Sequence, residues 1–186
     1  MPLSLRSISV ISLIALPLLV SFAPMSQAQE LVSRQQLVAK SDRKAEADRL
    51  FEQGNQLYGV SKYQEALQTW EQTLQIYRDI KDRNGEGNSL ISLGNAYISL
   101  GQYQKAIGFY QQSLAIKKQI GDRKGEGNSL GNLGIAYKFL GQFPKAIGFY
   151  QQSLAIKKQI GDRKGEGNSL NNLGLAYISL GQFQKG

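Results

Sequence analysis

Apolar residues recur at helical spacing along most of this chain. Between residues 121 and 160, Leu130, Leu133, Tyr137 and Leu140 form one stripe with the three- and four-residue intervals of an amphipathic helix. A second stripe follows it, formed by Ala146, Ile147, Tyr150 and Leu154. No segment has the alternation of apolar and polar residues that is typical of a β-strand. The pattern predicts an all-α fold made of consecutive helix pairs.

The ends of these helices carry residues suited to helix termini. Asp122 precedes the first stripe as a candidate N-cap, and Gly141 follows it, where a helix commonly ends. Pro144 is expected near the start of the second helix, because proline is favoured in the first turn. Lys157 and Lys158 come near its end, where the helix dipole favours cations.

The helix pair is repeated along the chain. Residues 105–130 and 145–170 are identical, and a fixed offset between copies is the mark of a repeat array. In register, the chain divides into units 41–80, 81–120, 121–160 and 161–186, the last of them incomplete. Small and large residues recur at fixed places in these units: Gly94, Gly134, Gly174, Ala106, Ala146, Tyr97, Tyr137, Tyr177, Tyr110 and Tyr150. The small residues would let neighbouring helices approach closely, and the tyrosines would fill the space between helix pairs. This arrangement predicts an α-solenoid.

The composition excludes several kinds of chemistry. The 186 residues include no His and no Cys, so Ser-His-Asp and Cys-His couples and the ordinary zinc ligands are missing. Disulfides are excluded as well, so apolar packing must hold the fold. We expect no catalytic residue, no cofactor, no metal site and no small-molecule substrate, and therefore no enzyme activity.

The N-terminal segment 1–28 belongs to a different class of sequence. A basic start and an apolar run over 8–23 lead to two small residues, Ser26 and Ala28. This order is typical of a secretory signal peptide, here cleaved between Ala28 and Gln29.

A membrane anchor is the alternative for this segment. Pro17 interrupts the apolar run, which is shorter than the ~20 residues needed to cross a bilayer. We therefore expect export, to the periplasm or out of the cell, and no membrane attachment after cleavage. Residues 29–40 are expected to be a loose leader or a helical extension of the first unit.

The repeated units resemble the tetratricopeptide repeat (TPR) family. The pattern Leu-Gly-x-x-Tyr, then Ala and a later aromatic residue, occurs twice, as Leu93–Gly94–Tyr97–Ala106–Tyr110 and Leu133–Gly134–Tyr137–Ala146–Tyr150. The first unit departs from it, with Gln53 and Leu57 replacing Leu and Tyr, although Trp70 keeps the later aromatic. The spacing of 40 residues exceeds the usual ~34 and resembles the longer repeats of G-protein signalling modulators. The resemblance implies a right-handed solenoid whose concave groove binds a protein or an extended peptide.

Variation between the units is concentrated on one helical face. Units 81–120 and 121–160 differ at nine of forty positions, and five of these fall in the first helix: Ile91/Gly131, Ser92/Asn132, Asn95/Ile135, Ile98/Lys138 and Ser99/Phe139. Their spacing puts them on one face, and in the TPR family that face lines the groove. The candidate peptide-binding residues are Asn88, Ile91, Asn95, Ile98, Asn128, Asn132, Ile135, Lys138, Phe139, Asn168, Asn171, Asn172 and Leu175.

The asparagines in this set suit an extended peptide, because an amide side chain both donates to and accepts from a peptide backbone. Random drift after duplication is the alternative, but drift should also have altered the second helix, which is unchanged from 105 to 120 and from 145 to 160. The TPR proteins that clamp a chaperone's C-terminal carboxylate present basic residues from the groove helices. Here the matching positions are all uncharged, which disfavours that partner: Phe51, Asn55, Ser92, Asn128 and Asn132.

Basic residues recur at one end of each unit. Lys117, Lys118, Arg123 and Lys124 are expected to form a basic ridge, repeated as Lys157, Lys158, Arg163 and Lys164 and partly neutralised by Asp122 and Glu126. Solvation and helix-end compensation are the leading interpretation, and an anionic surface or partner is the alternative. Nucleic acid needs a stronger patch, so no nucleic-acid partner is expected. The adjoining GDRKGEGN lacks the context of a phosphate-binding loop and is interpreted as structural.

Residues 181–186 are expected to begin the second helix of the fourth unit. Because a solenoid normally ends in a capping helix, we expect Leu170, Leu173 and Tyr177 to lack cover, and we interpret the chain as a fragment. The leading hypothesis is an exported scaffold that binds a protein or peptide and performs no chemistry. The alternatives are the recognition arm of a longer enzyme or signalling protein, for example with a caspase-like peptidase domain downstream, and a structural spacer.

Overall fold

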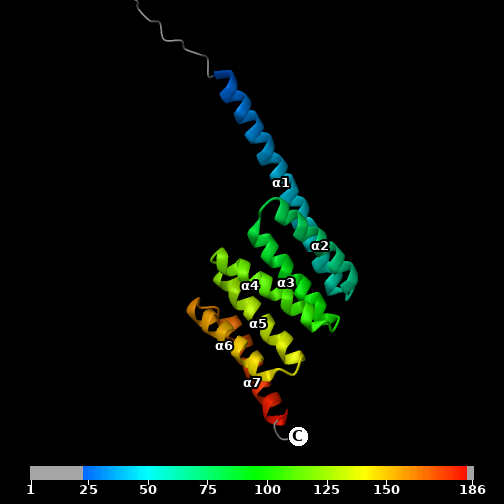
Figure 1. Ribbon diagram of the computed structural model, residues 1–186, viewed down its shortest axis with the longest axis vertical. Coiled ribbons are helices and arrows are strands. Elements are labelled where there is room, and N and C mark those ends of the chain that lie inside the picture. Colours follow the sequence, from blue (N-terminus) through cyan, green and yellow to red (C-terminus); the bar gives the residue numbers. More distant parts are fainter. Residues whose placement is uncertain (1–22, 184–186) are drawn as a thin grey trace, which may run out of the picture. The chain divides into compact units, whose positions relative to one another are not determined.

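The computed structural model describes residues 23–183, which form seven α-helices and no strand (Figure 1). The helices are α1 (Ala23–Gly59), α2 (Tyr63–Asp79), α3 (Arg83–Ser99), α4 (Tyr103–Gln119), α5 (Arg123–Phe139), α6 (Phe143–Gln159) and α7 (Arg163–Phe183). The all-α prediction is confirmed.

The chain separates into two compact units, Met1–Val38 and Ala39–Gly186. In the first, residues 1–22 of the expected signal peptide lie outside the described residues. The expected cleavage site, Ala28 and Gln29, lies within α1, and residues 29–40 are helical and exposed. Of the helices that the structure describes, none has the length and apolar character to cross a membrane.

Helix boundaries in the second unit follow local chemistry. The side chains of Asp82, Asp122 and Asp162 each accept a hydrogen bond from the backbone N–H of the residue three positions later, at 2.9, 2.8 and 2.9 Å. These bonds satisfy N–H groups that the first turn leaves free. Helices α3 and α5 end just before Gly101 and Gly141, whose φ values of +71° and +69° suit glycine. The expected N-cap at Asp122 and the stop at Gly141 are confirmed.

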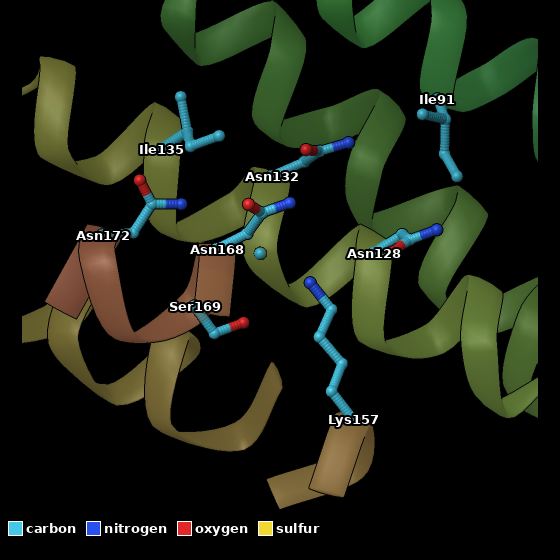
Figure 2. Close-up of a pocket in the computed structure, with 9 residues that line it drawn as sticks. Ile91, Asn128, Asn132, Ile135, Lys157, Asn168, Ser169 and Asn172 are labelled. Atoms are coloured by element: carbon cyan, nitrogen blue, oxygen red, sulfur yellow. The ribbon is translucent and has the colours of Figure 1, made fainter. Parts of the chain in front are cut away.

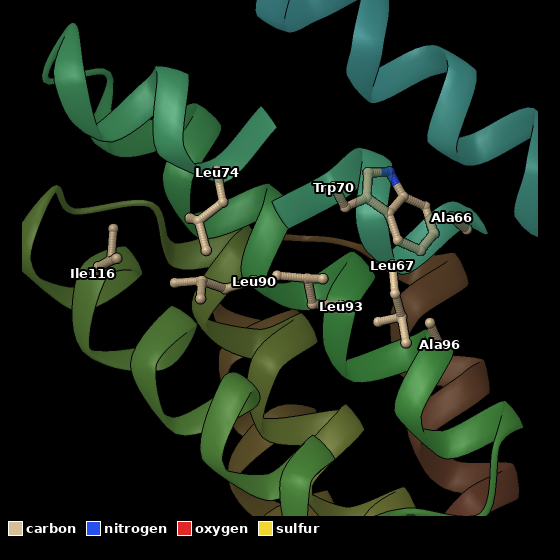
Figure 3. Close-up of a cluster of buried hydrophobic side chains, with 8 residues drawn as sticks. All are labelled: Ala66, Leu67, Trp70, Leu74, Leu90, Leu93, Ala96 and Ile116. Carbon is tan, nitrogen blue, oxygen red and sulfur yellow. The ribbon is translucent and has the colours of Figure 1, made fainter. Parts of the chain in front are cut away.

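Consecutive helices pack on one another from α2 to α7, and α3 also contacts α5, as α5 contacts α7. The first helices of successive pairs therefore lie side by side, which places the faces that vary between units next to each other. Apolar clusters hold these helices together. Figure 3 shows the cluster shared by α2, α3 and α4, formed by Ala66, Leu67, Trp70, Leu74, Leu90, Leu93, Ala96 and Ile116.

Glycines allow the paired helices to touch. A Cβ atom at Gly134 would lie 2.5 Å from Cε1 of Tyr150, and one at Gly94 would collide with Tyr110 in the same way. The predicted pairing of small and large residues is thus found in α3–α4 and α5–α6. It is not found at Gly174, where a Cβ atom would meet nothing within 4 Å.

Serine hydroxyl groups join the two helices of a pair at the GDRKGEGN segment and its counterpart in residues 81–88, and also reach the next pair. Ser113 on α4 donates to the Gly87 carbonyl of α3 at 3.0 Å and lies 3.0 Å from the Ser129 hydroxyl of α5. Ser153 repeats this pattern with the Gly127 carbonyl, at 2.7 Å. The segment carries buried contacts between helices, as the structural interpretation expected.

The end of α7 departs from two expectations. The helix continues through Gly181 to Phe183, so residues 181–183 do not begin a second helix. A turn at Gly181 would break helical hydrogen bonds, and in the described part of the chain no later helix packs on α7 to compensate for that loss. Leu173 is buried, at 8% exposure, because α6 covers it with Ala146, Ile147 and Tyr150. Leu170 and Tyr177 are each 52% exposed, as expected.

Candidate functional site

The variable faces of α5 and α7 border a cavity of about 290 Å³ (Figure 2). Spacings of three and four residues along each helix bring amide side chains to this one place. The lining residues are Ile91 on α3; Asn128, Gly131, Asn132 and Ile135 on α5; Lys157 on α6; and Asn168, Ser169 and Asn172 on α7.

The cavity gathers six of the thirteen candidate residues predicted from the sequence. These six are Ile91, Asn128, Asn132, Ile135, Asn168 and Asn172. Three further residues line it: Gly131, which the sequence placed on the variable face but not among the candidates, and Lys157 and Ser169, which sequence reasoning missed. Of these, Lys157 changes the chemistry of the site most, because it brings a cation among amides.

Other candidate residues lie outside this cavity, and some of them contact neighbouring side chains of the fold. Asn95 accepts a hydrogen bond from the Tyr110 hydroxyl at 2.8 Å. Phe139 stacks on Tyr103, with ring centroids 5.1 Å apart, and the Lys138 ammonium lies 5.3 Å from the Phe139 ring.

The remaining candidates also lie away from the cavity. Ile98 packs against the apolar cluster around Tyr110, whereas Asn171 and Leu175 are exposed on α7. The amide of Asn88 accepts a hydrogen bond from Lys117 at 2.7 Å.

Lys117 is buried at 1% exposure in a complete polar network. Its ammonium donates to Oδ1 of Asn84 at 2.6 Å and to Oδ1 of Asn88 at 2.7 Å, and it forms an ion pair with Asp122 at 2.9 Å. Burial alone would raise the pKa of Asp122, but the Gly125 amide and the Lys117 ammonium together lower it. A buried ammonium with these partners fixes the junction of α3, α4 and α5.

Lys157 is the equivalent residue of the next unit and is 8% exposed. Figure 2 shows its side chain rising from α6, with the amino group in the space between Asn128 and Asn168. Within residues 23–183, no hydrogen bond or salt bridge holds this ammonium. Burial lowers its pKa, and the charge of Asp162 opposes that effect.

The expected basic ridge is therefore wrong for two of its members. Lys117 and Lys157 turn inward, because small residues on the adjoining first helix leave space for their stems: a Cβ atom at Gly87 would lie 2.9 Å from Cε of Lys117. Lys118 and Lys124 are exposed as expected, and the Arg123 and Glu126 side chains pair at 2.5 Å.

One sequence difference accompanies the contrast between the two lysines. Asn84, an acceptor for Lys117, is replaced by Lys124 at the matching position of the next unit. That substitution was visible in the sequence as one of the nine differences. Its meaning depended on knowing that Lys117 reaches Asn84, which periodicity alone does not reveal.

Solved structures with similar folds support this architecture. The aspartyl phosphate phosphatase F of Bacillus subtilis matches with a TM-score of 0.72 and 17% identity, over 77% of this chain and 38% of that one. The TPR domain of Arabidopsis FLU matches with a TM-score of 0.60 and 24% identity, over 63% and 98%. The TPR2AB domain of yeast Sti1, solved in a complex with pHSP90, matches with a TM-score of 0.63 and 23% identity, over 75% and 49%.

These identities establish a shared fold and no more, and this chain spans less than half of the phosphatase and Sti1 chains. No curated protein matches the sequence. The family model described as tetratricopeptide repeat matches residues 45–119 and 125–185, which is most of the chain. Together with the stacked helix pairs of α2 to α7, this match shows that the chain belongs to the tetratricopeptide repeat family.

Proposed function

We propose that this protein is an exported scaffold that binds a protein, through an extended segment, on the face formed by α3, α5 and α7. The observation that carries the proposal is the cavity, where Asn128, Asn132, Asn168 and Asn172 converge from two neighbouring helices. A row of amides hydrogen-bonds a peptide backbone with little regard to its side chains. In support, the yeast Sti1 domain of similar fold was solved in a complex with pHSP90.

The binding proposal is tested with an array of extended peptides of random sequence. The double variant Asn132→Ala and Asn172→Ala removes two amides that form no hydrogen bond within residues 23–183. Each lost hydrogen bond contributes about 0.5–1.5 kcal/mol, so we expect roughly tenfold weaker binding or more, measured by calorimetry on the best array peptides.

A matched control removes side-chain amides from a different face of the protein. Gln112 and Gln152 are exposed on α4 and α6, and their replacement by Ala should leave binding unchanged. Equal affinity in the asparagine and glutamine variants would mean that the peptide binds somewhere other than this cavity.

Export is proposed from the pattern of residues 1–28, and its test is the intact mass of the protein from its native cell. Loss of residues 1–28 with an N-terminus at Gln29 would support cleavage. Retention of these residues would overturn it. A mass above the 20.6 kDa of this sequence would favour the second candidate, the recognition arm of a longer protein, which accords with the larger size of the phosphatase and Sti1 chains.

A further inference from the structure

One position of the second helix changes its partner from unit to unit. Tyr77 in α2 donates its hydroxyl to Asp48 of α1 at 2.6 Å. Lys117 in α4 donates to Asn88 of α3, which occupies the position equivalent to Asp48. In the next unit, Asn128 occupies that position, and the ammonium of Lys157 forms no hydrogen bond or salt bridge within residues 23–183.

One position near Lys157 differs in sequence from the equivalent position near Lys117. The second acceptor of Lys117, Asn84, is replaced by Lys124, a further cation. Asp162 acts on Lys157 electrostatically, but no salt bridge within 4.0 Å joins them, and its Oδ1 atom accepts from the Gly165 amide at 2.9 Å. The Lys157 ammonium thus lies at the wall of a cavity that is also lined by the amides of Asn128, Asn168 and Asn172.

A buried cation without a partner is unfavourable unless an anion or several acceptors meet it. The cavity of about 290 Å³ is far larger than the roughly 30 Å³ share of one water molecule, so it has room for a planar acid group with the carbon atoms that carry it. The side-chain amides of Asn128, Asn168 and Asn172 can donate to such a group beside the ammonium. Ser169 adds a hydroxyl, although that hydroxyl also lies 3.3 Å from the Ser153 hydroxyl.

We propose that Lys157 and these amides form a subsite for a carboxylate of the bound polypeptide, either an acidic side chain or a C-terminus. The inference rests on the proposed function and names the chemistry that the partner must carry. The cation comes from the second helix of a pair, α6, whereas the sequence-based search for basic residues considered only the groove helices. For that reason the uncharged groove positions do not exclude a carboxylate.

The test uses N-acetyl-triglutamate amide, the corresponding triglutamine, and inorganic phosphate as probes of the full chain. Binding is followed by NMR through the Cε–H signals of Lys157 and the side-chain amide signals of Asn128 and Asn168. We expect saturable shifts with triglutamate and none with triglutamine. A charge-assisted hydrogen bond is strong enough that Lys157→Met should weaken triglutamate binding about tenfold or more.

Two variants control for charge and for folding. Lys158→Met removes the same charge from an exposed neighbour and should leave triglutamate binding unchanged. Lys124→Asn restores the acceptor that Lys117 has, so it should engage Lys157 within the fold, weaken triglutamate binding and raise the melting temperature. Lys157→Met should also keep or raise the melting temperature, whereas Lys117→Met should lower it.

The possible outcomes separate the two proposals. Equal binding of triglutamate by Lys157→Met, equal shifts with triglutamine, or phosphate saturating the site at lower concentration than triglutamate would each overturn the carboxylate subsite. If array peptides still bind and depend on Asn132 and Asn172 while Lys157→Met has no effect, the groove stands and the subsite fails. A free triglutamate C-terminus in place of the amide distinguishes a terminal carboxylate from a side-chain one, by tighter binding of the free acid.

Discussion

At the scale of single residues, units 81–120 and 121–160 differ in the hydrogen bonding of a buried tyrosine hydroxyl. The Tyr110 hydroxyl donates to Asn95, but the matching position in the next unit is Ile135. The Tyr150 hydroxyl is accordingly buried without a hydrogen-bond partner among the described residues. A tyrosine hydroxyl is protonated at neutral pH, and burial raises the pKa of Tyr150 further, to about 12, so this hydroxyl is a donor without an acceptor.

Ile135→Asn should therefore stabilise the protein, and Asn95→Ile should destabilise it. Restoring one buried hydrogen bond contributes about 1 kcal/mol, and leaving the Tyr110 hydroxyl without its acceptor costs about 1–3 kcal/mol. Chemical denaturation of both variants measures the free energy of unfolding. Two changes of the same sign would show that solvent or a shifted side chain already satisfies Tyr150. Asn95 was assigned to binding from the sequence, and this bond gives it a structural role that neither spacing nor variation revealed.

At the scale of helices, the close approach within a pair depends on glycine in the first helix. Gly134 faces the ring of Tyr150, while Gly174 of α7 has open space beside it. The same residue in the same motif is therefore required in one helix and only tolerated in the other.

Gly134→Ala and Gly174→Ala form a matched pair with opposite expected effects. A methyl group at Gly134 must displace the Tyr150 ring, and such overpacking costs about 1–3 kcal/mol. At Gly174 the same change should stabilise the helix by up to about 1 kcal/mol, because alanine is the better helix former. Thermal unfolding followed by circular dichroism compares the two. Equal destabilisation would show that α7 has an unrecognised neighbour at Gly174.

At the scale of the molecule, the sequence predicted the fold well and part of the lining of the candidate cavity. The apolar stripes, the helix caps and the repeated units predicted helix pairs, because each of these is a local sequence pattern that occurs several times along the chain. The groove prediction found Asn128, Asn132, Asn168 and Asn172 for the same reason. The groove prediction missed Lys157, since the direction of a long side chain depends on contacts with other helices. The capping argument placed Leu173 outside the core, although α6 covers it.

An array of this kind is stabilised by a sum of unit and interface contributions, and these contributions are unequal along the chain. Residues 123–130 and 163–170 are identical, yet Leu130 is 2% exposed and Leu170 is 52% exposed. Leu175, Tyr177 and Ile178 are also exposed on α7. A half-exposed leucine side chain forfeits about 1 kcal/mol of burial, so α7 should open more readily than α5.

Hydrogen exchange measures this difference between α5 and α7. The intrinsic exchange rates of the two helices are nearly equal, because their sequences are similar. Peptides 123–135 and 163–175 share their first eight residues but differ in mass, so mass spectrometry can separate them. We expect the α7 peptide to exchange at least about tenfold faster, because opening it exposes less apolar surface. Equal protection of the two peptides would mean that the helix pairs unfold as a single cooperative unit, and the interfaces would then be too strong for α7 to open alone. In that case a peptide that binds Asn168 and Asn172 would bind a face that is already rigid. If α7 opens readily, the bound partner would order it, and the α7 amides would gain protection from exchange when the partner is added.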